Sequence, residues 1–218
     1  MGNSAEDLVK QSALLEILSQ ISKSFPNTIT ATLFVLGIML GKVAWICIAG
    51  GAIVLILVVG VFQKLFGSLT TEEYNVPGAA AVSACSIIPP NSILEASFSN
   101  IPSTWMSVTF FYLTYIVMNA LTIYNTKPTK AHSDSITVQH RKSMGTLSII
   151  TTVILLICMV CMRYFLWGTC ESIIGTLVGG SMGVGMGILW WQLLAACGPD
   201  VYPDIHGVMV GLKPRAMY

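Results

Sequence analysis

Hydrophobic residues gather along this chain into four long runs that contain neither aspartate nor glutamate. The runs are Val43–Phe62, Ser103–Tyr124, Leu147–Trp167 and Ser172–Ala196, and Arg163 is the one charged residue inside them. At about 1.5 Å per residue, each run forms a helix of about 30 Å, which is the thickness of the hydrocarbon core of a bilayer. Only a helix satisfies its own backbone hydrogen bonds over such a run, so the pattern predicts four transmembrane helices.

The N-terminal segment has a different pattern, because its apolar residues recur every three or four positions between residues 5 and 25. These residues are Leu14, Ile17, Leu18, Ile21 and Phe25. The spacing predicts an amphipathic helix that ends at Pro26 and Asn27. We therefore expect an amphipathic segment over 1–28 and a four-span domain over 29–218. The amphipathic helix lies either in the membrane interface or against protein, on a partner or on the chain itself.

A further apolar stretch, Ile29–Leu40, comes just before the first run, and only Gly41 and Lys42 separate the two. The 34 residues from Ile29 to Phe62 are too few for two transmembrane spans and a turn. We therefore expect one long helix that enters the membrane at Lys42, with the stretch before it lying on the bilayer surface or against another protein. A lysine at the bilayer centre costs about 2.5–3.5 kcal/mol, which favours placing Lys42 at the interface.

The composition agrees with a membrane protein. Of the 218 residues, 54% are apolar and 10% are charged, whereas soluble domains carry about 25% charged residues. This supply of charged residues is too small to cover a surface in water, which argues against a soluble globular enzyme. The net charge of +1 offers no electrostatic footprint for nucleic acid, and we expect no nucleic-acid partner.

Lysine and arginine are distributed unevenly between the two sides of the four-span arrangement. One side holds the N-terminal segment, the inner loop 125–146 and the C-terminal tail, and the other holds the outer loop 63–102 and the turn at 168–171. The first side has Lys10, Lys23, Lys42, Lys127, Lys130, Arg141, Lys142, Lys213 and Arg215, and the second has Lys64 and Arg163. The positive-inside rule then predicts that both termini face the cytoplasm. Lys42, Arg141 and Lys142 are the predicted membrane-interface anchors.

Glycines follow one side of the fourth run. Gly175, Gly179, Gly183 and Gly187 form three overlapping G-x-x-x-G steps, and glycines at this spacing let another helix approach the backbone closely. They are the predicted helix-packing residues. The partner is either the third span of the same chain, which we favour because a tight turn joins the two, or a span of another subunit.

Little in the sequence indicates chemistry. No nucleophile or zinc motif surrounds the histidines, so we predict no enzyme activity, catalytic residue, cofactor or metal. Cys85 and Cys170 both fall on the predicted outer side, where a lumen would let them form a disulfide; the alternative is two free thiols. Asn119 and Gln192 are the strongest uncharged polar groups in the spans, and we expect them to make interhelical hydrogen bonds.

The second run carries a family resemblance over about 25 residues. Pro102–Trp105, the aromatic pair Phe110-Phe111 and the stretch Asn119–Asn125 resemble a pattern in multi-pass inner-membrane and minor-capsid-associated proteins of nucleocytoplasmic large DNA viruses, including those of algae. In that pattern Pro-Ser-x-Trp precedes an aromatic run, and Asn-Ala and Tyr-Asn follow at the end of the span. The sequence differs at Tyr112 and Leu113, where the family often has a glycine.

The C-terminal tail, from Cys197–Asp200 to Gly211–Pro214, is similar to that family in a looser way. The resemblance implies a structural protein of the virion internal membrane that links the bilayer to the capsid shell within a larger assembly, with lipid and other membrane or capsid proteins as partners. It implies no catalytic residues. Two alternatives remain open from the residues alone: an accessory subunit of a cellular membrane complex, and a tetraspan channel or transporter subunit.

Overall fold

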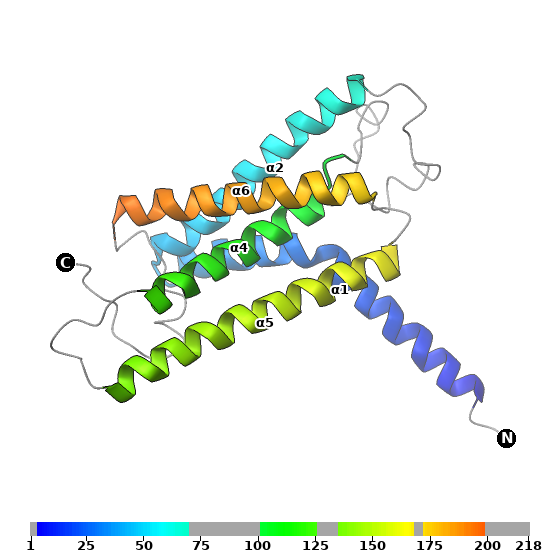
Figure 1. Cartoon of the computed structure of the whole chain (residues 1–218). Helices are drawn as coiled ribbons and strands as arrows, with labels where there is room; N and C mark the ends of the chain where they lie inside the picture. The colour runs from blue at the N-terminus through cyan, green and yellow to red at the C-terminus, as the bar shows by residue number, and fades with distance from the viewer. Residues whose placement is uncertain (1–3, 70–100, 126–134, 168–171, 199–218) are drawn as a thin grey trace.

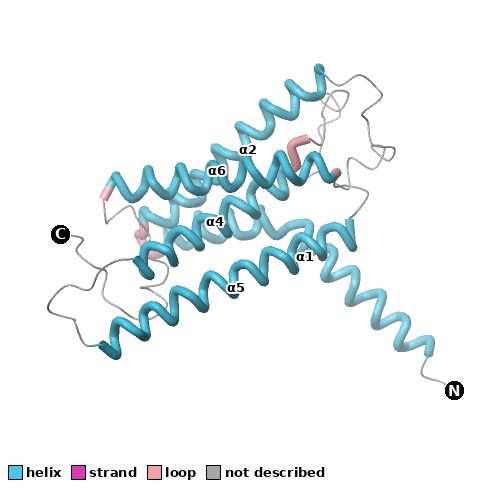
Figure 2. The backbone as a smooth tube through the Cα atoms, in the orientation of Figure 1, coloured by secondary structure: helices cyan, strands magenta, loops and turns pink. Residues whose placement is uncertain are grey.

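The computed structural model describes residues 4–69, 101–125, 135–167 and 172–198, and within these ranges every regular element is a helix (Figures 1 and 2). The helices are α1 (Ser4–Met39), α2 (Val43–Leu69), α4 (Thr104–Asn125), α5 (Ser135–Trp167) and α6 (Ile173–Cys197). Helices α2, α4, α5 and α6 are long and apolar enough to cross a membrane, and the second part of α1, Ser24–Met39, is a shorter apolar helix. The predicted fold class, an all-α multi-pass membrane protein with four such helices and an additional N-terminal helix, is confirmed.

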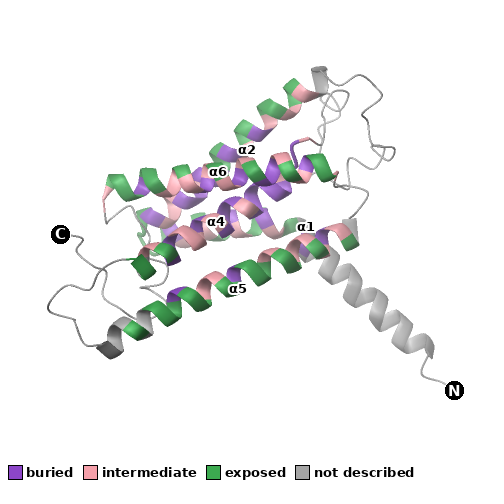
Figure 3. Ribbon diagram, viewed as in Figure 1, coloured by how far each residue is buried: buried purple, intermediate pink, exposed green. Residues whose placement is uncertain are grey.

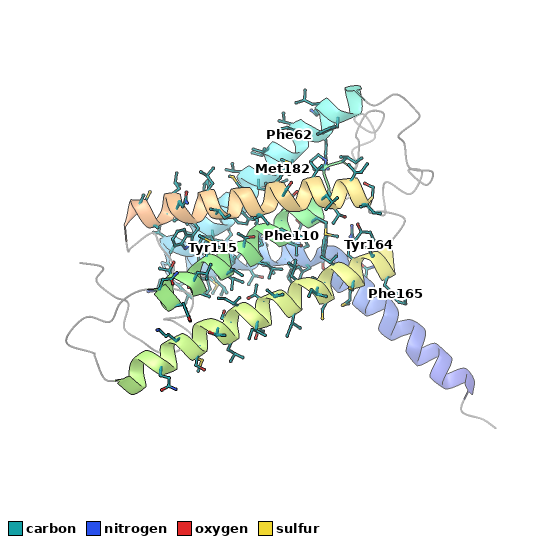
Figure 4. The ribbon with its side chains drawn as sticks, in the orientation of Figure 1. Phe62, Phe110, Tyr115, Tyr164, Phe165 and Met182 are labelled. Carbon is teal, nitrogen blue, oxygen red and sulfur yellow. The ribbon has the colours of Figure 1, made fainter. Side chains whose placement is uncertain are left out.

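The outside of the bundle is apolar, as a surface in contact with lipid requires. Figure 3 shows exposed residues along most of α5 and along the outer sides of α2 and α6. Large hydrophobic side chains on these surfaces include Leu57, Val61, Leu147, Ile150, Ile154, Ile157, Phe165, Leu177 and Leu189. In Figure 4, Phe165 points away from the bundle.

Two helices extend beyond the predicted spans. Helix α2 continues to Leu69, so the first residues of the predicted outer loop are helical, and α5 begins at Ser135, inside the predicted inner loop. The apolar run measures the depth of hydrocarbon, whereas a helix can continue into the interface, where water replaces lipid as its surroundings. At the end of α2, the Gln63 Nε2 group donates hydrogen bonds to the Pro102 carbonyl at 2.7 Å and to the Thr104 hydroxyl at 3.0 Å.

The predicted end of the first helix at Pro26 is wrong, because α1 continues through this proline to Met39. A proline has no N–H, so the carbonyl four residues earlier, that of Ser22, loses its helical partner. The indole N–H of Trp105 in α4 donates to that carbonyl at 2.8 Å. A neighbouring helix thus replaces the lost bond, and α1 crosses the predicted domain boundary at residue 28. Figure 1 shows that α1 changes direction where it reaches the bundle.

The single long helix predicted over Ile29–Phe62 is also wrong, because the chain reverses at Gly41. This glycine has φ +61, and the N–H groups of Gly41 and Lys42 donate to the carbonyls of Ile38 (3.2 Å) and Gly37 (2.8 Å). This pair of bonds is a Schellman ending, which closes a helix in very few residues. The stretch before the first run therefore packs on α2.

Helix α4 is the centre of the bundle. It contacts α6 and α5 most extensively, and α2 and α1 as well. Residues from α2, α4 and α6 form the main apolar cluster: Ile48, Ala52, Leu55, Val59, Val108, Phe111, Tyr112, Tyr115 and Leu194. Several polar side chains on α4 are buried too, among them Ser107, Thr109 and Asn119. Helix α4 therefore contacts every other helix of the described bundle.

Candidate functional site: the helix interfaces around α4

The glycine stripe of α6 lies against α4. Gly175, Gly179, Gly183 and Gly187 are all buried, and Gly180 beside them is buried as well. The predicted partner, the third span, is wrong: the stripe meets the second span, α4. Gly179 lies beside Ser103 and Gly187 lies beside Phe111, so α6 and α4 run in the same direction.

Contact between these two helices reaches the backbone. A Cβ atom at Gly179 would lie 2.6 Å from the carbonyl oxygen of Ser103, and one at Gly183 would collide with the carbonyl oxygen of Ser107. At the start of α6, the N–H of Ser103 donates to the Gly175 carbonyl at 3.0 Å. Neither backbone can move far without disturbing its own helix. The stripe therefore fixes the separation and the register of α6 against α4.

Beside the stripe, Gly180 of α6 faces a larger side chain of α4, that of Phe110. A Cβ at Gly180 would lie 3.5 Å from the ring of Phe110, an ordinary contact distance. Figure 4 shows Phe110 beside α4, on the side toward α6. The interface thus combines backbone contact along the glycines with aromatic packing beside them.

A second close approach joins α2 to α6, and the sequence analysis missed it. A Cβ atom at Gly51 would lie 2.6 Å from the Trp190 ring, whose Nε1 group donates to the Cys47 carbonyl at 2.9 Å. Gly51 is therefore required to seat the indole ring. The signal available in the sequence was the Gly50-Gly51 pair inside a transmembrane run, where small residues mark contacts between helices.

A buried cation lies near the start of α4. Arg163 of α5 is 2% exposed, and its guanidinium carbon lies 5.1 Å from the ring centroid of Trp105. Because the same indole donates to the Ser22 carbonyl, Trp105 joins α1, α4 and α5 at one point. We call Ser22, Trp105 and Arg163 the tryptophan junction. The signal for this residue in the sequence was its position within a span, because a charge there marks a structural or functional role.

Hydroxyl groups make another link between α1 and α4. The Thr30 hydroxyl donates to the Pro26 carbonyl at 2.7 Å and lies 2.8 Å from the Tyr112 hydroxyl. Thr30 has one hydroxyl proton, so when it donates to Pro26 the Tyr112 hydroxyl is the donor to Thr30. The direction of each bond follows from this count, and both buried hydroxyls are satisfied.

The predicted interface anchors lie at the other end of the bundle from the tryptophan junction. Lys42 is exposed in the turn between α1 and α2, and Arg141 belongs to α5. Lys142 is also exposed, and its Nζ atom lies 5.7 Å from the ring centroid of Tyr124. An exposed lysine beside a tyrosine is a pairing that suits the boundary between lipid and water.

The other candidate residues have separate outcomes. Cys85 and Cys170, the predicted disulfide, lie outside the described residues. Asn119 is buried in α4, whereas Gln192 is exposed on α6, and the interhelical hydrogen bonds predicted for them stay a prediction. Among the described residues, no three histidine, cysteine, aspartate or glutamate side chains gather as a metal site would require.

The arrangement as a whole is a set of helix contacts centred on α4, and it defines a multi-pass α-helical membrane protein. No protein family, curated protein or solved structure matches this chain.

Proposed function

We propose that the protein is a structural membrane protein, which anchors an assembly of other proteins to a bilayer. The observation that carries the proposal is the backbone contact between α6 and α4, where Gly183 lies against the Ser107 carbonyl. Contacts at this distance suit a bundle that keeps one shape. The proposal assigns the chain no catalytic role and no cofactor.

The family resemblance supports a narrower version of the proposal. On this version, the protein belongs to the internal membrane of a virion and links that membrane to the capsid shell. Its contact surface for capsid proteins is the basic side of the bundle, which includes Lys42 and Lys142 and the C-terminal end of α6. Under the positive-inside rule, this side faces the cytoplasm during assembly.

A channel or transporter subunit needs a polar path between its helices. The polar side chains of α4 do not favour one, because the Ser107 hydroxyl donates to the Ser103 carbonyl of its own helix at 2.9 Å. Phe110 lies on the same helix beside Gly180. An accessory subunit of a cellular membrane complex shares every feature used here, so the partner decides between it and the virion protein.

Cross-linking mass spectrometry on the full-length protein in its native membrane tests the proposal. We expect the dominant cross-links from Lys42 and Lys142 to reach a major capsid protein. Cross-links mainly to redox subunits would replace the virion protein with a cellular accessory subunit. A parallel flux assay on proteoliposomes tests the broader class, since ion or solute flux well above that of empty vesicles contradicts a purely structural role.

A further inference from the structure

The second part of α1 covers the same depth as a helix that spans the membrane. The Ser22 carbonyl is hydrogen-bonded to Trp105, and the Thr30 hydroxyl to Tyr112. The step from Ser22 to Thr30 along α1 is eight residues, and the corresponding step from Trp105 to Tyr112 along α4 is seven. The two helices therefore run side by side in the same direction. Since α1 continues to Met39, it reaches the level of the last turn of the α4 span, which covers Thr104–Thr122.

Helix α2 then returns across the same depth. It starts after the turn at Gly41 and reaches Gln63, whose side chain donates to the Pro102 carbonyl just before α4. Helices α1 and α2 therefore form a hairpin whose closed end is at Lys42. At the open end, α1 is bonded to Trp105 through the Ser22 carbonyl, and α2 is bonded to the Pro102 carbonyl through Gln63.

The sequence of this part of α1 suits hydrocarbon. No charged residue occurs between Lys23 and Lys42, an interval of 18 residues that is about 27 Å long as a helix. This is close to the thickness of the bilayer core. Phe34, Val35 and Ile38 are exposed on the outside of the bundle, whereas Thr30 is buried. Apolar side chains thus face outward over the second half of the segment, as expected of a helix in lipid, whereas the first half also exposes Asn27 and Thr28.

From this depth, direction and composition, we propose that Ser24–Met39 of α1 is a fifth membrane crossing, so that the start of α1 and the end of α6 lie on opposite sides of the bilayer. This arrangement replaces the predicted one in which both termini share a side. It does not depend on the proposed structural function.

With five crossings the net charge of the two sides differs more, whereas lysine and arginine divide less unevenly. They divide seven against four, compared with nine against two for four crossings, because Lys10 and Lys23 join Lys64 and Arg163. The side of the C-terminus keeps most of the basic residues: Lys42, Lys127, Lys130, Arg141, Lys142, Lys213 and Arg215. The opposite side gains most of the acidic ones: Glu6, Asp7, Glu16, Glu72, Glu73, Glu95 and Glu171. The positive-inside rule therefore still places the C-terminus in the cytoplasm, and one side of the protein is basic while the other is acidic.

Two epitope tags test the proposal on the full-length chain, one at each terminus, in sealed vesicles treated with protease. Five crossings predict that one tag is digested while the other is protected, whichever way the vesicles are oriented. Protease with detergent should digest both tags, which controls for sealing. Digestion or protection of both tags in sealed vesicles would overturn the proposal.

A charge in the middle of the segment provides the second test. Ala31 is exposed and lies near the centre of the interval between Lys23 and Lys42. Ala31→Lys should raise by at least about tenfold the fraction of molecules whose two tags share a side, because a lysine at mid-bilayer opposes insertion. Ala31→Met, of similar length and without charge, should behave as the parent protein. An equal distribution of tags in the two variants contradicts a crossing at this position.

Discussion

Helices α4 and α5 are both long enough to cross a bilayer, yet they meet very different surroundings. Of the membrane-length window, 61% is buried inside the protein in α4 and 17% in α5. The more buried helix is the less apolar of the two, and it carries Ser107, Thr109 and Asn119 in its buried surface. Helix α5 presents aliphatic side chains such as Ile154 and Ile157 to the outside.

The difference shows how polarity is arranged when lipid is the solvent. Apolar side chains gain little by leaving lipid for a protein interior, so a strongly apolar helix can remain at the periphery. Serine, threonine and asparagine are enclosed because their polar groups find partners only within the bundle. Among the spans of a chain like this one, the helix with the lowest hydropathy is therefore the candidate for the centre.

The largest effect is expected where α4 meets the backbone of α6. Gly183→Leu would push a side chain into the Ser107 carbonyl, and we expect a loss of about 4 kcal/mol or more, above the usual cost of overpacking because backbone must move. Thermal unfolding in lipid nanodiscs measures it. Gly185→Leu is the matched control, since a Cβ there meets nothing within 4 Å. Equal melting temperatures for the two variants would remove the packing role of the stripe.

Truncating one leucine on each helix tests the comparison directly. Leu113 of α4 is 6% exposed and Leu155 of α5 is 43% exposed. Leu113→Ala should cost about 2–3 kcal/mol, because it leaves a cavity, whereas Leu155→Ala should stay within about 0.5 kcal/mol. Unfolding curves in the same nanodiscs give both values. Similar losses at the two positions would show that the outside of α5 is covered by protein.

Two tryptophan hydrogen bonds can be compared, one to a carbonyl that has no helical donor and one to a carbonyl that has such a donor. Trp105→Phe leaves the Ser22 carbonyl without a donor, since Pro26 cannot replace the indole, and should cost about 2 kcal/mol. Trp190→Phe is the control, because the Cys47 carbonyl lies within the continuous helix α2 and keeps a helical donor. We expect this variant to lose about 1 kcal/mol or less. A larger loss for Trp190→Phe contradicts the role assigned to Pro26.

The smallest effect concerns the link between α1 and α4. Tyr112→Phe removes the donor to Thr30, which still donates to the Pro26 carbonyl, so we expect a loss of about 1 kcal/mol. Tyr124→Phe, at an exposed tyrosine, should change stability little. Both are measured by thermal unfolding, and no difference between them would argue against a hydrogen bond at Tyr112.

Length and charge in the sequence were sufficient to locate four membrane-length helices and the glycine stripe. They could not identify the partner of the stripe, because the spacing of Gly179 and Gly183 describes one helix surface only. The choice of α5 assumed that neighbours in sequence pack together. The structure instead pairs α6 with α4, which runs parallel to it.

Local rules also failed where a distant residue changed their outcome. Proline predicts the end of a helix because its missing N–H leaves a carbonyl without a partner. In α1, that partner is Trp105, which is 83 residues away from Ser22 in the sequence. Similarly, the interval from Ile29 to Phe62 predicted one helix, whereas the chain turns at Gly41 between α1 and α2.

The bond between Trp105 and Ser22 has a mechanical consequence. Helix α1 leaves the bundle at the point where this bond and Pro26 hold it, and Figure 1 shows its first part projecting well beyond the other helices. A force applied to that projecting part would load this bond together with the direct contacts of α1 with α2 and α5. The Trp105 side chain thus binds α1 close to where its projecting part begins.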